Sequence, residues 1–139
     1  MTSADILLVE DNEDDVLLTL TALKRLGFGD KTAVCRDGVD ALEYLFREGS
    51  HAQRDGLTQP KLVLLDIKLP KIDGIEVVRR LKRDTRTKSI SVVMLTSSSR
   101  QADISAASQA GADHYLTKSV DFGRFSQEIA QISRQFLGA

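Results

Sequence analysis

The chain has 139 residues, of which 42% are hydrophobic and 28% are charged, a balance typical of one globular domain with its own core. Nineteen basic and twenty acidic residues give a net charge of -1, which excludes a bulk electrostatic attraction to nucleic acid or to an anionic membrane. The single cysteine excludes an internal disulfide and, with no apolar run long enough to cross a bilayer and no signal-peptide pattern at the start, indicates a cytoplasmic protein.

The chain opens with a short apolar run, residues 5–9, which predicts a buried strand and ends in Glu10 and Asp11. The next four residues offer a capping side chain and acidic groups that suit the positive end of a helix. Asp14 and Asp15 are interpreted as exposed acids of this first turn. Apolar side chains recur after them at helical spacing and predict one buried stripe: Val16, Leu17, Leu20 and Leu23.

Residues 31–35 form a weaker strand pattern, and Asp37 is a suitable cap for a helix that Gly49 would end. The polar segment 50–60 follows and is expected to be the longest irregular loop of the chain. Its histidine, His51, has no metal-ligand spacing and is interpreted as an ordinary loop residue.

An unbroken apolar run, residues 62–65, is typical of a strand that is buried on both faces. Asp66 follows it directly, and a loop ending in Asp73 and Gly74 leads into a helix over 74–84. A carboxylate at the end of a buried strand is either a helix cap or a reactive group. The choice depends on what the other strands bring to the same edge of the sheet.

Two further strands are predicted at 91–95 and 114–117, the first ending in Thr96 and the second in Lys118. Between them lies a helical segment rich in Ala and Ser, which Gly111 closes. The last helix carries aromatic and aliphatic residues three and four positions apart, which predicts a face packed on the sheet: Phe122, Phe125, Ile129, Ile132 and Phe136.

Five strands alternating with five helices predict an α/β fold with a parallel sheet covered on both faces. Right-handed crossovers leave few topologies, and the flavodoxin-like (βα)5 doubly wound sheet with strand order 2-1-3-4-5 is expected. Ligands of such sheets bind beyond the carboxyl ends of the strands. The predicted strands deliver five polar side chains to that edge: Glu10, Asp11, Asp66, Thr96 and Lys118.

The composition of this edge predicts a cation site and phosphoryl chemistry. Three neighbouring carboxylates repel one another unless cations intervene. A divalent ion together with Lys118 would bring the charge near zero, and Mg²⁺ suits a site of carboxylate oxygens, water and phosphate. Asp66 would then act as a nucleophile toward phosphorus, while Lys118 and the Thr96 hydroxyl supply positioning and charge stabilisation.

The motifs along the chain are Glu10-Asp11, Asp66 with Leu69-Pro70 and Asp73-Gly74, Thr96, and Lys118. This set, which extends over the whole chain, resembles the receiver domain of two-component response regulators. The resemblance implies a single receiver domain over residues 1–139 with no output domain. It also implies that Asp66 accepts a phosphoryl group from a phosphohistidine on a sensor histidine kinase.

The resemblance implies roles for further residues. Mg²⁺ would be held by Glu10, Asp11, Asp66 and the backbone carbonyl of Lys68. Thr96 would be the switch hydroxyl, and Tyr115 the switch aromatic that turns inward on activation, with static packing as the alternative for Tyr115. The surface of the fourth helix, fifth strand and fifth helix is the family's usual face for a homodimer or another partner.

Two features depart from the common pattern of the family. The residue after Lys118 is usually a proline that follows a cis peptide, and here it is Ser119. A cis bond to a non-proline residue costs about 3–4 kcal/mol, so the geometry of the peptide between them is left open. The ending at 116–119 and the long segment 50–60 resemble the stand-alone regulators that serve bacterial phytochrome kinases, which implies such a kinase as partner.

Two other classes of function compete with a signalling switch. A hydrolase with an aspartyl nucleophile needs a second acid two residues after it, and that position is Lys68. A degenerate receiver that only binds partners would not need the intact acidic set and Lys118. We therefore expect a switch that is not a turnover enzyme and has neither a nucleic-acid nor a membrane partner.

Overall fold

The computed structural model describes residues 4–54, 59–118 and 121–137. The peptide between Lys118 and Ser119 lies outside this part of the chain. One parallel sheet has the order β2-β1-β3-β4-β5, which confirms the predicted fold and topology. Its strands are β1 (Ile6–Val9), β2 (Thr32–Cys35), β3 (Leu62–Leu65), β4 (Ser91–Thr96) and β5 (His114–Thr117).

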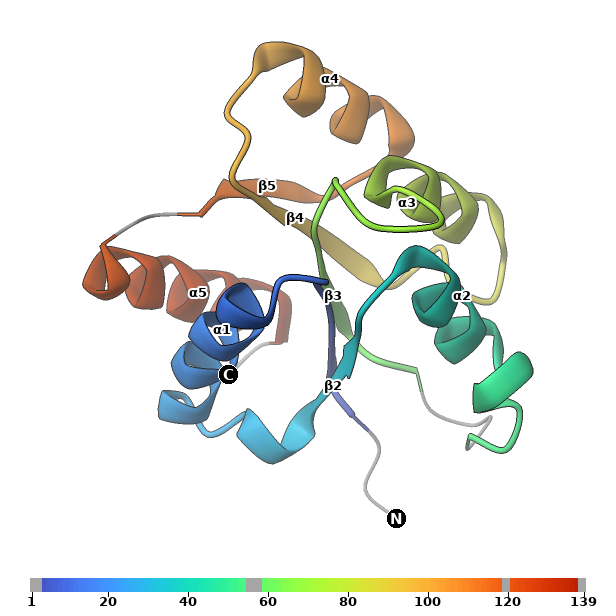
Figure 1. Cartoon of the computed structure of the whole chain (residues 1–139), viewed down its shortest axis with the longest axis horizontal. Helices are drawn as coiled ribbons and strands as arrows, with labels where there is room; N and C mark the ends of the chain where they lie inside the picture. Colours follow the sequence, from blue (N-terminus) through green and yellow to red (C-terminus); the bar gives the residue numbers. More distant parts are fainter. Residues whose placement is uncertain (1–3, 55–58, 119–120, 138–139) are drawn as a thin grey trace.

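Helices cover both faces of the sheet (Figure 1). Helices α1 and α5 lie side by side on one face, and α2, α3 and α4 lie on the other. The α-helices are α1 (Glu13–Arg25), α2 (Gly38–Phe46), α3 (Gly74–Arg83), α4 (Gln101–Ala110) and α5 (Phe122–Leu137). Two single turns of 3₁₀ helix, η1 (Gly29–Lys31) and η2 (Gly49–His51), follow α1 and α2.

The central strands are buried because each of their side chains enters one of two cores. Successive side chains of a strand point to opposite faces of the sheet. Leu7 and Val9 of β1 therefore pack under α2 and α3, whereas Ile6 and Leu8 pack under α1 and α5. All four residues of β1 and of β3 are buried, as a strand covered on both faces requires.

Side-chain caps begin the three helices that follow β1, β2 and β3. In each case the capping oxygen accepts a hydrogen bond from the N–H three residues later, which satisfies a free donor of the first turn. The bonds join Asn12 to Asp15 (3.0 Å), Asp37 to Asp40 (2.7 Å) and Asp73 to Glu76 (3.0 Å). These caps fix the short loops at the edge of the sheet where the predicted site lies.

The predicted buried stripe of α1 is partly wrong, because Leu17 is 62% exposed. The helix turns its buried face toward α5 and the sheet along a different row of residues: Val16, Thr19, Ala22 and Leu23. Leu17 lies about 100° around the helix from Val16, which carries it out of this face.

The end of α2 also differs from the prediction. The helix ends at Phe46, and Arg47 adopts the left-handed conformation (φ 54°), so Gly49 does not end α2 but begins η2. Of the predicted loop, residues 50–51 belong to η2, whereas residues 52–54 and 59–60 belong to no helix or strand, as expected, and are tied to α2. Arg54 donates a hydrogen bond to the carbonyl of Tyr44 (2.8 Å), and Gln59 to that of Leu45 (2.8 Å).

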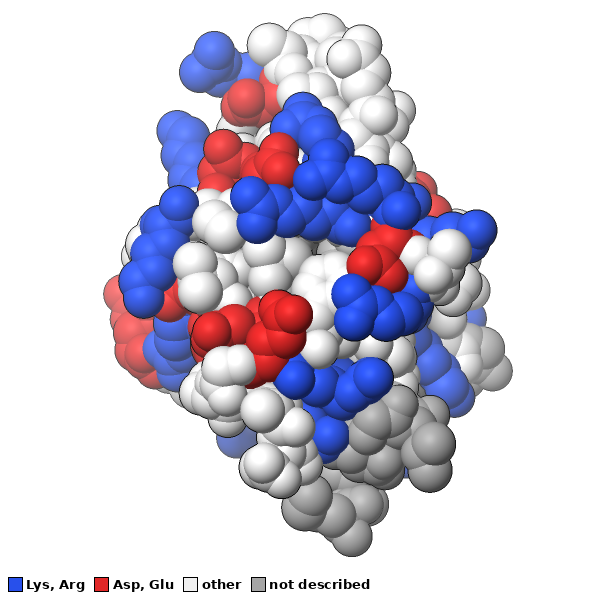
Figure 2. Space-filling view, turned by 90° about the vertical axis from the view of Figure 1, so that its right-hand side faces the viewer, with Lys and Arg blue, Asp and Glu red and all other residues white. Residues whose placement is uncertain are grey.

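Lys and Arg side chains gather on the face shown in Figure 2, but Asp and Glu are mixed among them. Glu76 of α3 accepts hydrogen bonds from Arg79 (2.7 Å) and Arg80 (3.0 Å), and Arg86 pairs with Asp84 (2.9 Å). These cations are therefore compensated locally. No helix among the residues described is long and apolar enough to span a membrane.

Candidate functional site

Three site residues are fixed at the sheet edge by ladder hydrogen bonds that continue one residue past the strands. Their N–H groups donate to carbonyls of the neighbouring strand: Glu10 to Cys35 (3.0 Å), Asp66 to Val9 (3.2 Å) and Lys118 to Thr96 (2.7 Å). The backbone of the sheet therefore determines where these three side chains begin.

The side chain of Lys118 joins the ends of β1, β3 and β5. Its Nζ donates to Oε1 of Glu10 at 2.5 Å, to Oδ2 of Asp15 at 2.8 Å and to Oδ2 of Asp66 at 3.2 Å. The three donors of the ammonium are thereby all used. The Lys118 side chain is only 10% exposed, so this is a buried charge cluster. The structure brings together Glu10, Asp66 and Lys118 as the sequence predicts.

Asp15 is the residue of this cluster that the sequence interpretation missed. It was expected to be an exposed acid like Asp14, but it is half-buried and bonded to Lys118, whereas Asp14 is exposed. The cap at Asn12 places Asp15 at the end of the first turn of α1, facing the sheet edge. The only signal of this role in the sequence is that Asp15 lies three residues after a capping asparagine. An acid at that position is common in helix caps that have no functional role, so the signal is not specific.

Burial and neighbouring charges shift the pKa values of Glu10 and Lys118 in this cluster. Burial, and then the neighbouring charge of Asp66, raises the pKa of Glu10 to about 7, against the lowering effect of Lys118. Burial works to lower the pKa of Lys118, but its hydrogen bonds to Asp15 and Glu10 outweigh this and raise that pKa. Lys118 therefore stays protonated, and Glu10 is the group that gains a proton near neutral pH.

The acidic residues at this edge fit a hard divalent cation. Glu10, Asp11 and Asp66 each offer a carboxylate oxygen within 4.8 Å of the other two. Glu10 and Asp66 are buried and Asp11 is exposed, so the set opens to solvent on one side. With Asp15 added and all four carboxylates ionised, the acids exceed the ammonium of Lys118 by three negative charges. Mg²⁺ binds through a few carboxylate oxygens and keeps some of its waters, which suits this arrangement.

The loop after Asp66 is folded tightly against its own backbone. The N–H of Gly74 donates to the carbonyl of Ile67 at 2.7 Å, and a Cβ at Gly74 would lie 2.0 Å from the carbonyl oxygen of Asp66. Lys68 is exposed, and its N–H lies 3.4 Å from Oδ1 of Asp66. The proposed metal contact of the Lys68 carbonyl stays a prediction.

Thr96 and Tyr115 both contact the loop between β4 and α4. The buried Thr96 hydroxyl accepts a hydrogen bond from the N–H of Ser98 at 3.4 Å. The half-buried Tyr115 donates its hydroxyl to the carbonyl of Ser98 at 2.8 Å. In this structure Ser98 therefore connects the two predicted switch residues, and the ring of Tyr115 is held against the loop.

Known proteins are similar to this chain over most of its length. The model of the response regulator receiver domain family matches residues 6–130. The "Probable methanogenesis regulatory protein FilR2" of Methanothrix harundinacea (strain 6Ac) is 40% identical over 134 residues, which cover 96% of this chain and 83% of that protein.

Two solved structures are similar over nearly the whole chain. The phosphorylated cyanobacterial phytochrome response regulator RcpA has a TM-score of 0.87 and 35% identity, covering 98% of this chain and 95% of that one. The Mn²⁺-bound form of response regulator Rcp1 has a TM-score of 0.80 and 33% identity, covering 93% and 91%.

Proposed function

Because this chain belongs to the family of response regulator receiver domains, we propose that Asp66 is its phosphoacceptor and that phosphorylation of Asp66 switches a protein-interaction surface. The observation that supports this assignment best is the convergence of Lys118 on Asp66 and Glu10. It places a buried ammonium beside a strand-end carboxylate, next to further acids suited to a divalent ion.

The proposed reaction is a phosphoryl transfer from a histidine of a sensor kinase. An oxygen of Asp66 forms the new bond to phosphorus, the bond from phosphorus to the kinase imidazole breaks, and the imidazole nitrogen keeps the electron pair. The Lys118 ammonium, 3.2 Å from Oδ2 of Asp66, is placed to stabilise negative charge on the phosphoryl group. The buried hydroxyl of Thr96 would donate a hydrogen bond to the same group.

We propose Glu10, Asp11, Asp66 and the Lys68 carbonyl as the ligands of Mg²⁺. When bound, Mg²⁺ would supply positive charge to the phosphoryl oxygens. The Mn²⁺-bound form of Rcp1, a similar protein, supports a divalent ion in this family, and the three clustered carboxylates support it for this chain.

The switch would run through Ser98. When Thr96 turns to the phosphoryl group, its hydroxyl leaves the N–H of Ser98, and the loop that holds Tyr115 is released. Tyr115 would then turn inward. This device changes shape without turnover of a substrate, which is why we assign a signalling role and not that of a turnover enzyme.

The output surface would be the face of α4, β5 and α5, used for a homodimer or another protein. Strand β5 is an edge of the sheet, with His114 exposed on it. A groove of about 450 Å³ runs between β5 and α5, lined in part by Thr117, Arg124 and Glu128. Because RcpA is a phytochrome response regulator, we propose a bacterial phytochrome as the kinase and the cytoplasm as the location.

The proposal is tested by incubating the protein with acetyl phosphate and Mg²⁺ and measuring the intact mass. We expect one added phosphoryl group in the wild type and in the control Asp14→Asn, and none in Asp66→Asn. The same samples in light scattering should show a larger mass after phosphorylation if the face of α4, β5 and α5 forms a homodimer. No phosphoryl gain in the wild type, or a gain that survives Asp66→Asn, would contradict the assignment.

A further inference from the structure

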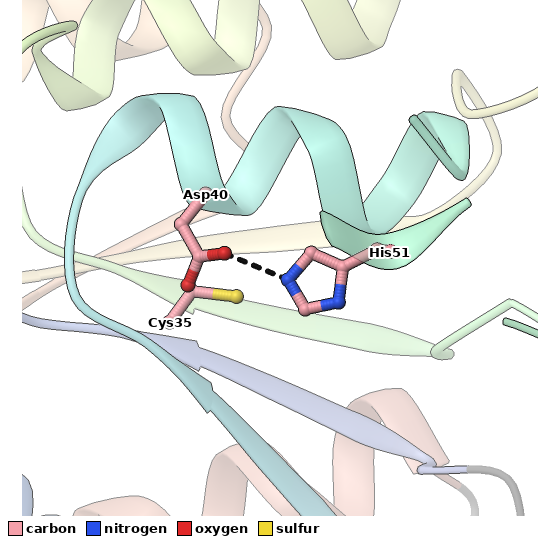
Figure 3. Close-up of side chains that lie close together, drawn as sticks. All are labelled: Cys35, Asp40 and His51. Carbon is pink, nitrogen blue, oxygen red and sulfur yellow. Dashed lines mark hydrogen bonds and ion pairs between the residues drawn. The ribbon is translucent and has the colours of Figure 1, made fainter. Parts of the chain in front are cut away.

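Three side chains of different ligand types converge between the end of β2 and α2, and none of them belongs to the acidic site. Cys35 is the last residue of β2, Asp40 lies in the first turn of α2, and His51 ends η2. Each offers one ligand atom within 4.8 Å of the other two. Figure 3 shows the Cys35 sulfur and the Asp40 carboxylate pointing toward the His51 ring, whose Nε2 lies 2.7 Å from Oδ1 of Asp40.

We propose that Cys35, Asp40 and His51 form a second metal site, which binds Zn²⁺. Zinc accepts one sulfur, one nitrogen and one oxygen ligand, and three protein ligands leave its fourth position to water. In a tetrahedral site with normal zinc bond lengths, neighbouring ligand atoms lie about 3.3–3.8 Å from one another. Nε2 of His51 and Oδ1 of Asp40, 2.7 Å apart, would have to open to about 3.3 Å, and the metal would replace their mutual hydrogen bond. The sulfur of Cys35 lies within 4.8 Å of both.

The burial of the three residues gives the site an inner and an outer side. Cys35 is 1% exposed and would bind the metal from the protein interior. The side chains of His51 and Asp40 are 27% and 32% exposed, so an ion can enter between them. The ring of Tyr44 contacts the His51 ring edge-on, with 5.1 Å between centroids, and limits its orientations.

The charges around the site favour a divalent cation. Burial, and then the charge of Asp40, raises the pKa of the Cys35 thiol, so the thiol is neutral without a metal. On binding, a sulfur–zinc bond replaces the S–H bond and the proton passes to solvent. The thiolate and Asp40 then balance the two charges of Zn²⁺, while the neighbouring charges of Asp37 and Arg54 oppose each other.

The site would act as a structural clip. Its ligands come from β2, α2 and η2, so bound Zn²⁺ would hold η2 against α2. The assignment shares no residue with the phosphoacceptor site and does not depend on phosphorylation. Mg²⁺ at the carboxylate site and Zn²⁺ at this site would be chosen by their ligands, oxygen alone in the first and sulfur with nitrogen in the second.

The test uses Co²⁺ as a spectroscopic substitute for Zn²⁺ on the reduced protein after treatment with a chelator. A thiolate bound to Co²⁺ gives a charge-transfer absorption in the near ultraviolet, which the carboxylate site lacks the sulfur to produce. We expect this band to saturate at one equivalent of Co²⁺ and to disappear when Zn²⁺, the tighter-binding ion, is added. We also expect Zn²⁺ to raise the melting temperature of the wild type.

Variants assign the band to the three residues. Cys35→Ser should abolish it, and Asp40→Asn and His51→Ala should weaken Co²⁺ binding at least about tenfold. His114→Ala, which removes the other histidine at an exposed position of β5, should bind as the wild type does. The His51 side chain is partly exposed, whereas Cys35 is buried, so we expect His51→Ala to fold and to test the site even if Cys35→Ser does not fold. No band in the wild type, or a band unchanged in His51→Ala, would refute the site.

Discussion

The ammonium of Lys118 lies 2.5 Å from Oε1 of Glu10, closer than to Oδ2 of Asp66 at 3.2 Å. In the protein without metal, Lys118 is therefore the cation that compensates the strand-end acids. A divalent ion at Glu10, Asp11 and Asp66 would share this task and leave Lys118 freer to contact a phosphoryl group.

Removing this cation should destabilise the metal-free protein. Lys118→Met leaves buried Glu10 and Asp66 without their partner, and such a loss costs about 3 kcal/mol of unfolding free energy. Urea denaturation in the presence of a chelator measures this loss of unfolding free energy. Added Mg²⁺ should restore part of the loss. Lys68→Met, at an exposed position, is the matched control and should change stability by less than about 0.5 kcal/mol. Equal stability of the two variants would contradict the role of Lys118 as counter-cation.

The raised pKa of Glu10 makes stability depend on pH. Because the folded state holds the Glu10 proton up to about pH 7 and an ordinary glutamic acid releases it near 4.5, this group stabilises the fold below about pH 4.5. The contribution is lost as the pH rises through about 7. We expect the unfolding free energy of the wild type, relative to Glu10→Gln, to fall by roughly 1–3 kcal/mol between pH 4.5 and 8. Parallel pH curves for the two proteins would show that Glu10 titrates normally.

The ion pair of Asp15 with Lys118 should contribute less to the unfolding free energy than the ion pair of Glu10 with Lys118, because the Asp15 side chain is 34% exposed. Asp15→Asn keeps an oxygen that can accept from Lys118 but removes the negative charge of this ion pair, and we expect a loss of about 0.5–1 kcal/mol of unfolding free energy in the metal-free protein. Asp14→Asn, one residue earlier in the same turn, is the control for the charge near the helix start. A loss as large in Asp14→Asn would mean that the helix dipole, and not Lys118, explains the effect.

The sequence predicts the sheet and most of the candidate site because parallel strands deliver their following residues to one edge. Glu10, Asp66 and Lys118 each continue the ladder of their strand by one hydrogen bond, so finding the strand ends is enough to bring them together. Buried apolar runs mark those ends clearly. The family resemblance depends on the same residues.

The contacts that the sequence does not predict depend on the orientation of one helix and on the backbone conformation of one residue. Asp15 meets Lys118, and Leu17 stays exposed, because of the angle at which α1 lies on the sheet. His51 meets Cys35 and Asp40 because α2 ends at a left-handed Arg47 and η2 turns back along it. No spacing in the sequence encodes that return, since it depends on the conformation of one non-glycine residue.

Phosphorylation of Asp66 should move the ring of Tyr115. The chain has two tyrosines and no tryptophan, so in Tyr44→Phe the intrinsic emission comes from Tyr115 alone. In the unphosphorylated protein Tyr115 is half-buried and its hydroxyl is bonded to the carbonyl of Ser98. If phosphorylation releases this bond and the ring turns inward, acrylamide should quench the Tyr115 emission less after addition of acetyl phosphate and Mg²⁺. The change should be absent in Tyr44→Phe combined with Asp66→Asn. Unchanged quenching in a sample that mass spectrometry shows to be phosphorylated would mean that Tyr115 is static packing, and that the signal leaves Thr96 by another route.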